Sequence, residues 1–191
     1  MSSTPRVFIV HGYLASPSSH WFPWLRDELS ERGANVDVIP LPQSESPQLE
    51  AWLDCLKDRV GVPDERTHFV AHSLGCVATL KYLQAWPSDT LIGSLMLVAG
   101  FTGRLLNLPQ LDGFTESAVD FASLRRMAPV RHVLLSENDM VVRPPHTEKL
   151  AEDLLAKLWR VPDAGHFLGS EGVTRLDQAL EILAPRLHQG T

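Results

Sequence analysis

The chain has 191 residues, of which 44% are hydrophobic and 21% charged, and its formal net charge at pH 7 is −6. These values are typical of one folded domain over residues 1–191; they exclude a disordered or fibrous chain, and the negative charge without a Lys/Arg run argues against nucleic acid as a partner. No window approaches the ~20 apolar residues of a membrane span and no signal-peptide pattern opens the chain, so we expect a cytoplasmic protein that does not enter a membrane.

Apolar runs that suit buried parallel strands recur six times along the chain. They lie at Val7–Val10, Val36–Ile39, His68–Ala71, Ser94–Val98, His132–Leu135 and Leu158–Val161. Apolar residues at helical spacing fill the gaps over residues 21–29, 49–56, 77–83 and 149–155, and a last amphipathic helix is expected over residues 176–187. This alternation predicts an α/β fold, a three-layer α/β/α sandwich with a six-stranded parallel sheet.

Residue types that begin and end helices punctuate this pattern. Ser46-Pro47 is typical of an N-cap and a first helical residue, whereas Arg32-Gly33 and Trp86-Pro87 are typical of helix ends. The interval from Phe101 to Val130 is longer than a simple crossover, so we expect a loop as well as a helix there. Such a loop either covers a binding site as a lid or crosses the surface without a role, and both alternatives stay open.

The run from Thr67 to Cys76 carries the strongest functional signal in the chain. It reads THFVAHSLGC, a buried strand that reaches Ser73 and turns directly into a helix. Ala71 and Gly75, two positions on either side of Ser73, are small where a side chain would collide in so sharp a turn. This arrangement is typical of a nucleophile elbow, which holds the serine hydroxyl clear of the sheet in a strained backbone conformation. The alternative is a helix N-cap serine without chemistry, because Ser-Leu-Gly also occurs in ordinary turns.

A serine hydroxyl is a poor nucleophile without a general base, and histidine suits that role at neutral pH. Of the eight histidines, His166 is the best placed, because it follows the last expected strand at the carboxyl edge of the sheet. His11 is expected to shape the loop after the first strand, and His72 should point away from its neighbour Ser73. The alternative for His166 is a surface loop histidine.

A carboxylate is needed to fix the imidazole tautomer and to stabilise imidazolium. Asp139 is the best candidate, because it follows the strand His132–Leu135 and so also lies at a carboxyl-terminal strand end. Glu137 is the fallback, since strand ends are uncertain by a few residues. The resulting chain order is Ser, Asp, His, which is the order of α/β-hydrolases.

Backbone N–H groups are expected to stabilise an oxyanion beside the serine. Leu74 N–H is one donor by the geometry of the elbow, and the loop after the first strand should supply the other. Gly12 lets that loop approach the serine closely, so Tyr13 N–H is the expected second donor, with Leu14 as the near alternative. His-Gly at a strand end is also compatible with a simple tight turn.

With these residues in place, the chain resembles the α/β-hydrolase superfamily and, within it, the small serine hydrolases similar to retinoblastoma-binding protein 9. The segments that carry the resemblance are Phe8–Gly12, His20–Leu25, Ala71–Gly75, Ser136–Asp139 and Gly165–Phe167. The resemblance implies a minimal hydrolase fold without a large cap domain, and it carries the catalytic triad onto Ser73, Asp139 and His166. Ala71 stands where relatives more often have glycine, which the turn tolerates because Ala is small.

The expected function is hydrolysis of esters of small or medium acyl groups through an acyl-enzyme. A thioesterase or an aminopeptidase-like amidase on the same residues is the alternative, and a non-catalytic binding protein that keeps the fold is the rival from another class. The expected partner is a small-molecule ester or amide, and the protein is expected to be a monomer or homodimer.

No metal or other cofactor is expected, and Cys55 and Cys76 are predicted to be reduced, packed thiols because both lie in apolar helical patterns. Met140 and Phe167 are expected to line the pocket, although either could equally belong to the core.

Overall fold

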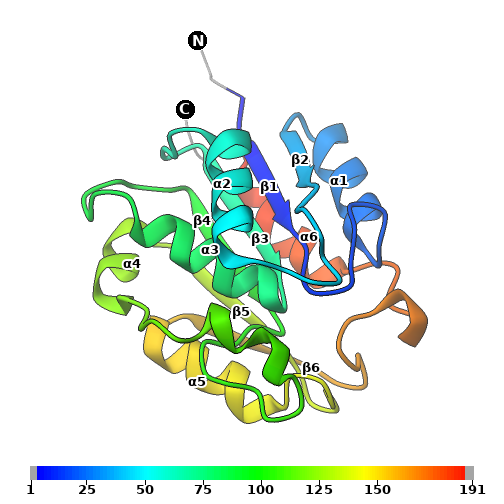
Figure 1. Cartoon of the computed structure of the whole chain (residues 1–191). Coiled ribbons are helices and arrows are strands. Elements are labelled where there is room, and N and C mark those ends of the chain that lie inside the picture. The colour runs from blue at the N-terminus through cyan, green and yellow to red at the C-terminus, as the bar shows by residue number, and fades with distance from the viewer. Residues whose placement is uncertain (1–3, 188–191) are drawn as a thin grey trace.

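The computed structural model describes residues 4–187 and shows a central sheet with helices on both faces (Figure 1). The elements in chain order are β1 (Arg6–Val10), α1 (Phe22–Glu31), β2 (Asn35–Ile39), α2 (Leu49–Val60), β3 (Thr67–His72), α3 (Leu74–Gln84), β4 (Ser94–Val98), η1 (Pro109–Phe114), α4 (Phe121–Met127), β5 (Arg131–Ser136), α5 (Pro144–Leu154), β6 (Lys157–Val161), η2 (Gly169–Glu171), α6 (Asp177–Leu183) and η3 (Ala184–Arg186). Each of the six strands expected from the sequence is present within this order.

The six strands form one parallel sheet in the order β2-β1-β3-β4-β5-β6. β3 lies between β1 and β4, and Ala71 near its end is paired with Val10 on one side and Leu97 on the other. Because parallel strands end at the same edge, the loops after β1, β3, β5 and β6 all open at one edge of the sheet. That edge carries the candidate site.

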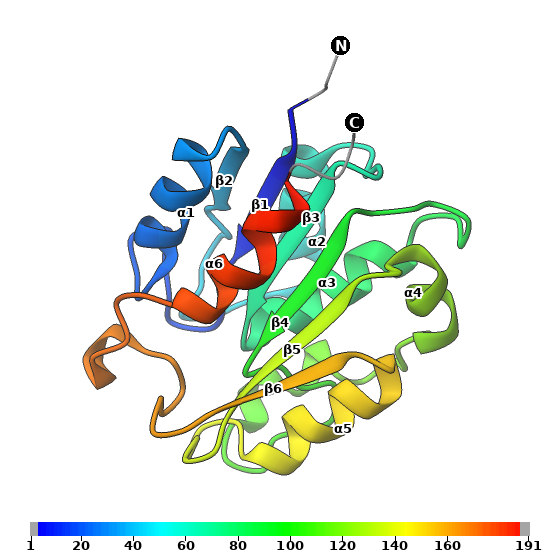
Figure 2. The ribbon, with the colours of Figure 1, turned by 180° about the vertical axis from the view of Figure 1, so that it is seen from behind.

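The central strands β1, β3, β4 and β5 are buried almost throughout, which explains why they are continuous apolar runs in the sequence. The edge strands β2 and β6 are partly exposed, although the sequence predicted them to be buried as well. α2, α3, α4 and α5 pack on one face around a cluster that includes Phe8, Phe69 and Leu97. α1 and α6 pack on the other face around Ile9 and Val70, as the view from behind shows (Figure 2). Successive strand residues thus enter opposite clusters, as the period of two requires. The predicted three-layer α/β/α architecture is confirmed.

Two expected helix ends differ from the structure. α2 begins at Leu49 after an extended Gln48, whereas Ser46 closes a preceding turn by donating its N–H to the carbonyl of Gln43. The Ser46-Pro47 signal was therefore wrong, because the chain is still turning at the residues that would begin the helix. At the other end of the chain, α6 stops at Leu183 and continues only as the short 3₁₀ helix η3, which contains Pro185, a residue without an N–H to donate.

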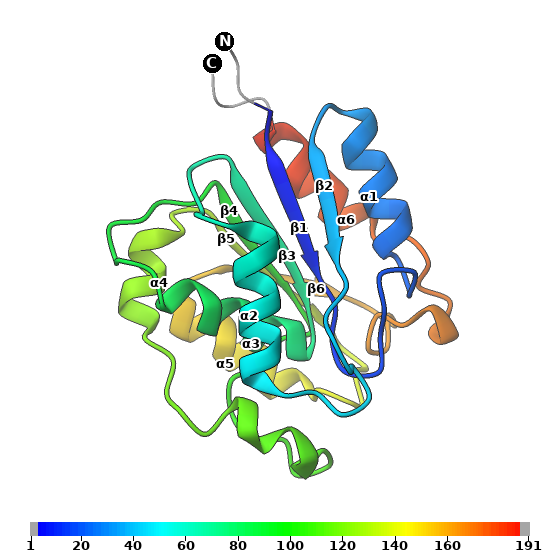
Figure 3. The same cartoon turned by 45° about the horizontal axis from the view of Figure 1, so that its top comes forward.

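The long interval between β4 and β5 holds η1 and α4 and is anchored at several points. Phe114, the last residue of η1, is buried and packs edge-on against Trp52 of α2, with ring centroids 5.2 Å apart. Figure 3 shows η1, in green, below the amino-terminal end of α2. Lys81, in α3, donates from Nζ to the carbonyl groups of Ser117 and Ala118 in this interval. The interval therefore contains a loop and a helix, as expected, and its role as a lid stays a prediction.

None of the helices within residues 4–187 is long and apolar enough to cross a membrane.

Candidate active site

Ser73 lies between the last residue of β3 and the first residue of α3, with φ 54° and ψ −122°. A positive φ is strained for a residue with a side chain, at a cost of ~1 to 3 kcal/mol, and such strain is typical of functional sites. Gly75 makes the turn possible, because a Cβ there would lie 2.4 Å from the carbonyl oxygen of His11 and 2.5 Å from that of Val10. The start of α3 therefore packs directly on the end of β1, in the geometry of a nucleophile elbow.

The three predicted triad residues meet at the carboxyl edge of the sheet. His166 Nε2 lies 2.9 Å from Ser73 Oγ, and His166 Nδ1 lies 2.7 Å from Asp139 Oδ2. They come from the ends of three strands, β3, β5 and β6, and all three are buried, with 7%, 2% and 4% of Ser73, Asp139 and His166 exposed. The hydroxyl is thus hydrogen-bonded to a base that is itself oriented by a carboxylate.

Asp139 is fixed on both of its carboxylate oxygens. Oδ1 accepts the N–H groups of Val141 and Val142 at 2.8 and 2.9 Å, while Oδ2 faces His166 Nδ1. An ionised carboxylate accepts hydrogen bonds only, so Nδ1 of His166 carries the proton and Nε2 is left to accept from the serine hydroxyl. Glu137, the fallback, is exposed and takes no part in this chain of hydrogen bonds.

The loop after β1 lies against the elbow. A Cβ on Gly12 would be 3.0 Å from Ser73 Cβ and 3.3 Å from Leu74 N, so the backbone approaches as closely as only glycine allows. Leu14 N–H already donates to the carbonyl of Ser44 at 2.9 Å, which leaves Tyr13 N–H as the better candidate of the two. Leu74 is the first residue of α3, and its N–H therefore has no acceptor within the helix.

His11 fixes the direction in which Tyr13 N–H points. Its Nε2 accepts Leu41 N–H at 3.1 Å, and Nδ1 therefore donates to the carbonyl of Gly12 at 3.0 Å. The Gly12 carbonyl and the Tyr13 N–H point in opposite directions on one planar peptide unit, so the ring holds that N–H away from itself. Burial lowers the pKa of His11, which keeps the ring neutral and able to make both contacts.

His72 points away from Ser73, as expected, and its contact with the His166 loop could not be foreseen from the residue pattern. Its Nε2 donates to the carbonyl of His166 at 2.9 Å, and the two rings lie 4.9 Å apart. Burial, reinforced by the neighbouring His166, lowers the pKa of His72 well below its ordinary value. A neutral histidine on β3 is therefore linked directly to the loop that carries His166.

The two expected pocket residues differ in exposure. Met140 is 73% exposed beside Asp139, so its place on the rim of the pocket stays a prediction. Phe167 is completely buried in the cluster that contains Trp21 and Phe22. Of the two alternatives left open for Phe167, pocket or core, the structure therefore shows the core: its backbone has φ 57°, and its ring packs beneath the loop rather than at the surface.

The two cysteines are both free thiols, Cys76 buried and Cys55 partly buried, and within residues 4–187 no group of three or more His, Cys, Asp or Glu side chains is placed to hold a metal ion. His188 lies outside the described residues.

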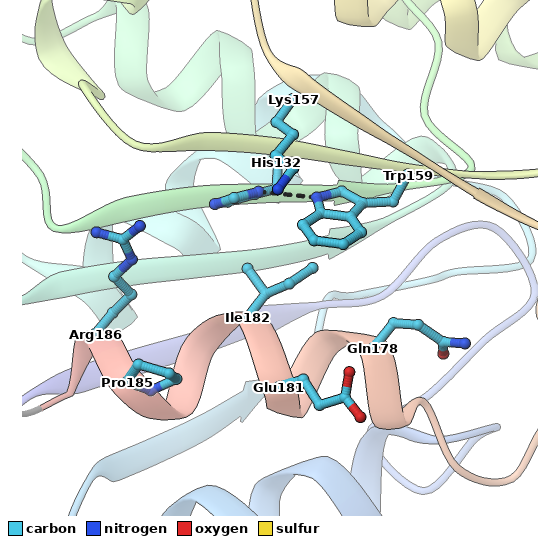
Figure 4. A pocket seen from close by; sticks show the side chains of 8 residues that line it. All are labelled: His132, Lys157, Trp159, Gln178, Glu181, Ile182, Pro185 and Arg186. Atoms are coloured by element: carbon cyan, nitrogen blue, oxygen red, sulfur yellow. Dashed lines mark hydrogen bonds between the residues drawn. The ribbon is translucent and has the colours of Figure 1, made fainter.

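A hollow of about 370 Å³ lies elsewhere, between β5, β6 and α6 (Figure 4). It is lined by His132, Lys157, Trp159, Gln178, Glu181, Ile182, Pro185 and Arg186. His132 accepts the indole N–H of Trp159 at 3.0 Å, and Lys157 lies over the indole ring. Both His132 and Lys157 are near the amino ends of their strands, at the opposite edge from Ser73, so this hollow is separate from the triad.

Comparison with known proteins agrees with this geometry. The family model described as serine hydrolase matches residues 7–185, nearly the whole chain. The chain belongs to the serine hydrolase family. Among the relatives of this serine hydrolase, YdeN of Bacillus subtilis strain 168 is 38% identical over 180 residues, which cover 94% of this chain and 95% of YdeN. The serine hydrolase RBBP9 of Rattus norvegicus is 23% identical over 193 residues, which cover 98% of this chain and all of RBBP9.

Solved structures show the same fold. The crystal structure of the Bacillus subtilis YdeN product matches this serine hydrolase with a TM-score of 0.93 and 38% identity, over 96% of this chain and 98% of that one. Est1E from Butyrivibrio proteoclasticus, solved with ferulic acid bound, matches with a TM-score of 0.68 over 95% of this chain and 90% of that one. Its identity is 16%, so this second likeness concerns the fold alone.

Proposed function

We propose that this serine hydrolase cleaves esters of small or medium acyl groups through a covalent acyl-enzyme on Ser73. The observation that carries the proposal is the continuous hydrogen-bond chain from Ser73 Oγ through His166 to Asp139, with links of 2.9 and 2.7 Å. In this arrangement the histidine binds the serine hydroxyl and the buried carboxylate orients the histidine. Such an arrangement activates serine for acyl transfer.

In the proposed acylation step, His166 Nε2 removes the proton of Ser73 as Oγ attacks the ester carbonyl carbon. Asp139 stabilises the imidazolium that forms, and the Tyr13 and Leu74 N–H groups donate to the carbonyl oxygen as it becomes negative. The intermediate then collapses, the bond to the alcohol oxygen breaks, and His166 returns its proton to the departing alcohol.

In the proposed deacylation step, His166 removes a proton from water, which attacks the acyl carbon of the ester on Ser73. The second tetrahedral intermediate occupies the same N–H donors, and the proton returns from His166 to Ser73 Oγ as the carboxylic acid leaves. Besides the ester and one water molecule, the proposed steps use Ser73, His166, Asp139 and the two N–H donors.

We infer the size of the acyl group from how much space the fold leaves around Ser73. Only 7% of Ser73 is exposed, so the approach to the hydroxyl is narrow. Between β4 and β5 the chain inserts only η1 and α4, too little for a large cap domain that would enclose a long acyl chain. Small or medium acyl groups fit these limits best. The cytoplasmic location and the monomeric or homodimeric state stay predictions from the sequence.

The test is labelling by a fluorophosphonate, followed by hydrolysis of p-nitrophenyl esters of increasing acyl length. We expect the wild type to be labelled, and we expect both Ser73→Ala and His166→Ala to lose labelling and about 10⁴-fold or more in turnover. Ser88→Ala, which removes an exposed hydroxyl in the loop after α3, is the matched control and should behave as wild type.

Among the esters, kcat/KM should be highest for acetate or butyrate and should fall for longer acyl groups. A higher kcat/KM for a thioester or an anilide of the same acyl group would favour the thioesterase or the amidase over the esterase. A wild type that is neither labelled nor active would contradict the proposal and leave the non-catalytic binding protein as the better account.

A further inference from the structure

The loop that carries His166 is held in place mainly by side chains from other parts of the chain. No strand or helix includes residues 165–168, so their backbone groups need other partners. Three side chains supply most of them: Asn138 accepts Gly165 N–H, Glu171 accepts the N–H groups of His166 and Leu168, and His72 donates to the His166 carbonyl. The backbone supplies the rest, since Phe167 N–H donates to the carbonyl of Ala164 and the Leu168 carbonyl accepts the N–H groups of Glu171 and Val173. His20 accepts the N–H of the next residue, Gly169. The position of the His166 ring therefore depends on these contacts.

Glu171 makes two of these hydrogen bonds with one oxygen. Its Oε2 accepts His166 N–H at 2.7 Å and Leu168 N–H at 3.1 Å. The carboxylate also lies flat against Gly165, since a Cβ at that position would be 2.3 Å from both Cδ and Oε1 of Glu171. Gly165 has φ 53°, so both its conformation and its lack of a side chain suit the contact.

His72 holds the other main-chain group of the same residue. It is 2% exposed, is the last residue of β3 and directly precedes Ser73. Its donation to the His166 carbonyl at 2.9 Å therefore links the main chain of the histidine to the strand that carries the serine. The N–H and the carbonyl of His166 are thus both bound by side chains, one from each side.

We propose that Glu171 and His72 are positioning residues that hold the main chain of His166 and so keep Nε2 in line with Ser73 Oγ. This inference rests on the proposed function, because alignment matters only if the pair reacts. A displacement of about 1 Å at such a base costs about 100-fold in rate, so losing one of the two contacts should lower kcat about 10- to 100-fold.

Glu171 offers the cleaner test, because it is exposed and its removal should leave the core intact. Glu171→Ala removes the acceptor, whereas Glu171→Gln keeps a carbonyl oxygen that can accept both N–H groups. Gly165→Ala should break the same contact while Glu171 stays in the sequence, because its methyl group must displace the Glu171 carboxylate. Glu152→Ala, which removes an exposed carboxylate from α5, is the matched control.

The readouts are kcat and KM for p-nitrophenyl acetate, the rate of fluorophosphonate labelling, and Tm. We expect Glu171→Ala to lower kcat and the labelling rate 10- to 100-fold with KM within about twofold of wild type, and Glu171→Gln to recover most of the loss. Gly165→Ala should lower kcat at least as much as Glu171→Ala, because its methyl group displaces the same carboxylate and also puts a side chain at φ 53°.

A Glu171→Ala enzyme with wild-type kcat would overturn the proposal, and so would a Gln variant as impaired as the Ala variant. Loss of activity that only follows a lower Tm would also overturn it, because the role would then be structural. A wild type that is neither active nor labelled removes the proposed function and this inference together, whereas an active wild type matched by its Glu171→Ala variant removes this inference alone.

Discussion

The Asp139 carboxylate makes three hydrogen bonds, and together they determine which ring nitrogen of His166 carries the proton. The two backbone N–H groups of Val141 and Val142 require an acceptor at Oδ1, so the other oxygen faces His166. An asparagine at this position would keep its carbonyl oxygen on the backbone and turn its amide NH₂ toward Nδ1. The ring would then carry its proton on Nε2 and could no longer accept one from Ser73.

Asp139→Asn should therefore leave the fold and KM nearly unchanged and lower kcat about 10⁴-fold, because the tautomer is wrong. The measurement is kcat and KM for p-nitrophenyl acetate between pH 7 and 9, with Tm as the control for folding. A kcat within tenfold of wild type would show that Asp139 does not set the tautomer.

The three triad residues could be predicted at this scale because each follows a strand at the carboxyl edge, where a parallel sheet gathers its loops. The contacts of Glu171 and His72 with the loop could not, because they join residues 5 and 94 positions apart and follow no repeating pattern. For Phe167 the sequence leaves pocket and core open, because only the conformation of the loop after His166 decides which way its ring turns.

The junction of β3 and α3 is the element on which the site depends. Gly75 lies within the first turn of α3, and the helix can pack on the end of β1 only because this residue has no Cβ. The three atoms nearest to such a methyl group, two from His11 and one from Val10, all belong to the backbone, so none can rotate away. α3 would have to move as a whole, and Ser73 would move with it.

Gly75→Ala is expected to lower the free energy of unfolding by ~1 to 3 kcal/mol, as overpacked sites do, and to reduce fluorophosphonate labelling of the protein that remains folded. Gly103→Ala is the matched control, because a Cβ at Gly103 meets no atom within 4 Å. Thermal or urea unfolding of both variants checks the prediction, and equal stability of the two would contradict it.

The order of elements could be predicted well because buried parallel strands are apolar on both faces and amphipathic helices separate them. Helix ends were harder. α2 begins after Gln48 without a side-chain cap, so residue types alone pointed to the wrong start at Ser46-Pro47. Its true start follows a turn in which Ser46 N–H donates to the carbonyl of Gln43, and the Ser44 carbonyl holds this turn to the loop after β1 by accepting Leu14 N–H.

At the scale of the whole molecule, burial lowers the pKa of five histidines in different parts of the fold. They are His11, His20, His68, His72 and His132, and the pKa of His68 falls to about 4. In the unfolded chain each returns to about 6.5, so below that pH the unfolded chain binds more protons than the folded protein. The free energy of unfolding is therefore unaffected by these groups above about pH 6.5, and it falls as the pH drops from there toward each folded pKa.

We therefore expect Tm to fall as the pH is lowered from 7.5 to 4.5, with proton uptake on unfolding. His68→Gln should make this fall shallower, even if its Tm at pH 7.5 is below that of wild type, because one of the responsible groups is gone. Thermal unfolding of both proteins across this range checks the sign. A Tm that is constant or rises toward pH 4.5 would contradict it.

Peptide mass spectrometry after fluorophosphonate labelling shows whether Ser73 is the nucleophile. We predict one adduct per chain, on the peptide that contains Ser73, formed by the wild type and absent from His166→Ala. An adduct on another residue, or stoichiometric labelling that persists in Ser73→Ala, would contradict the account.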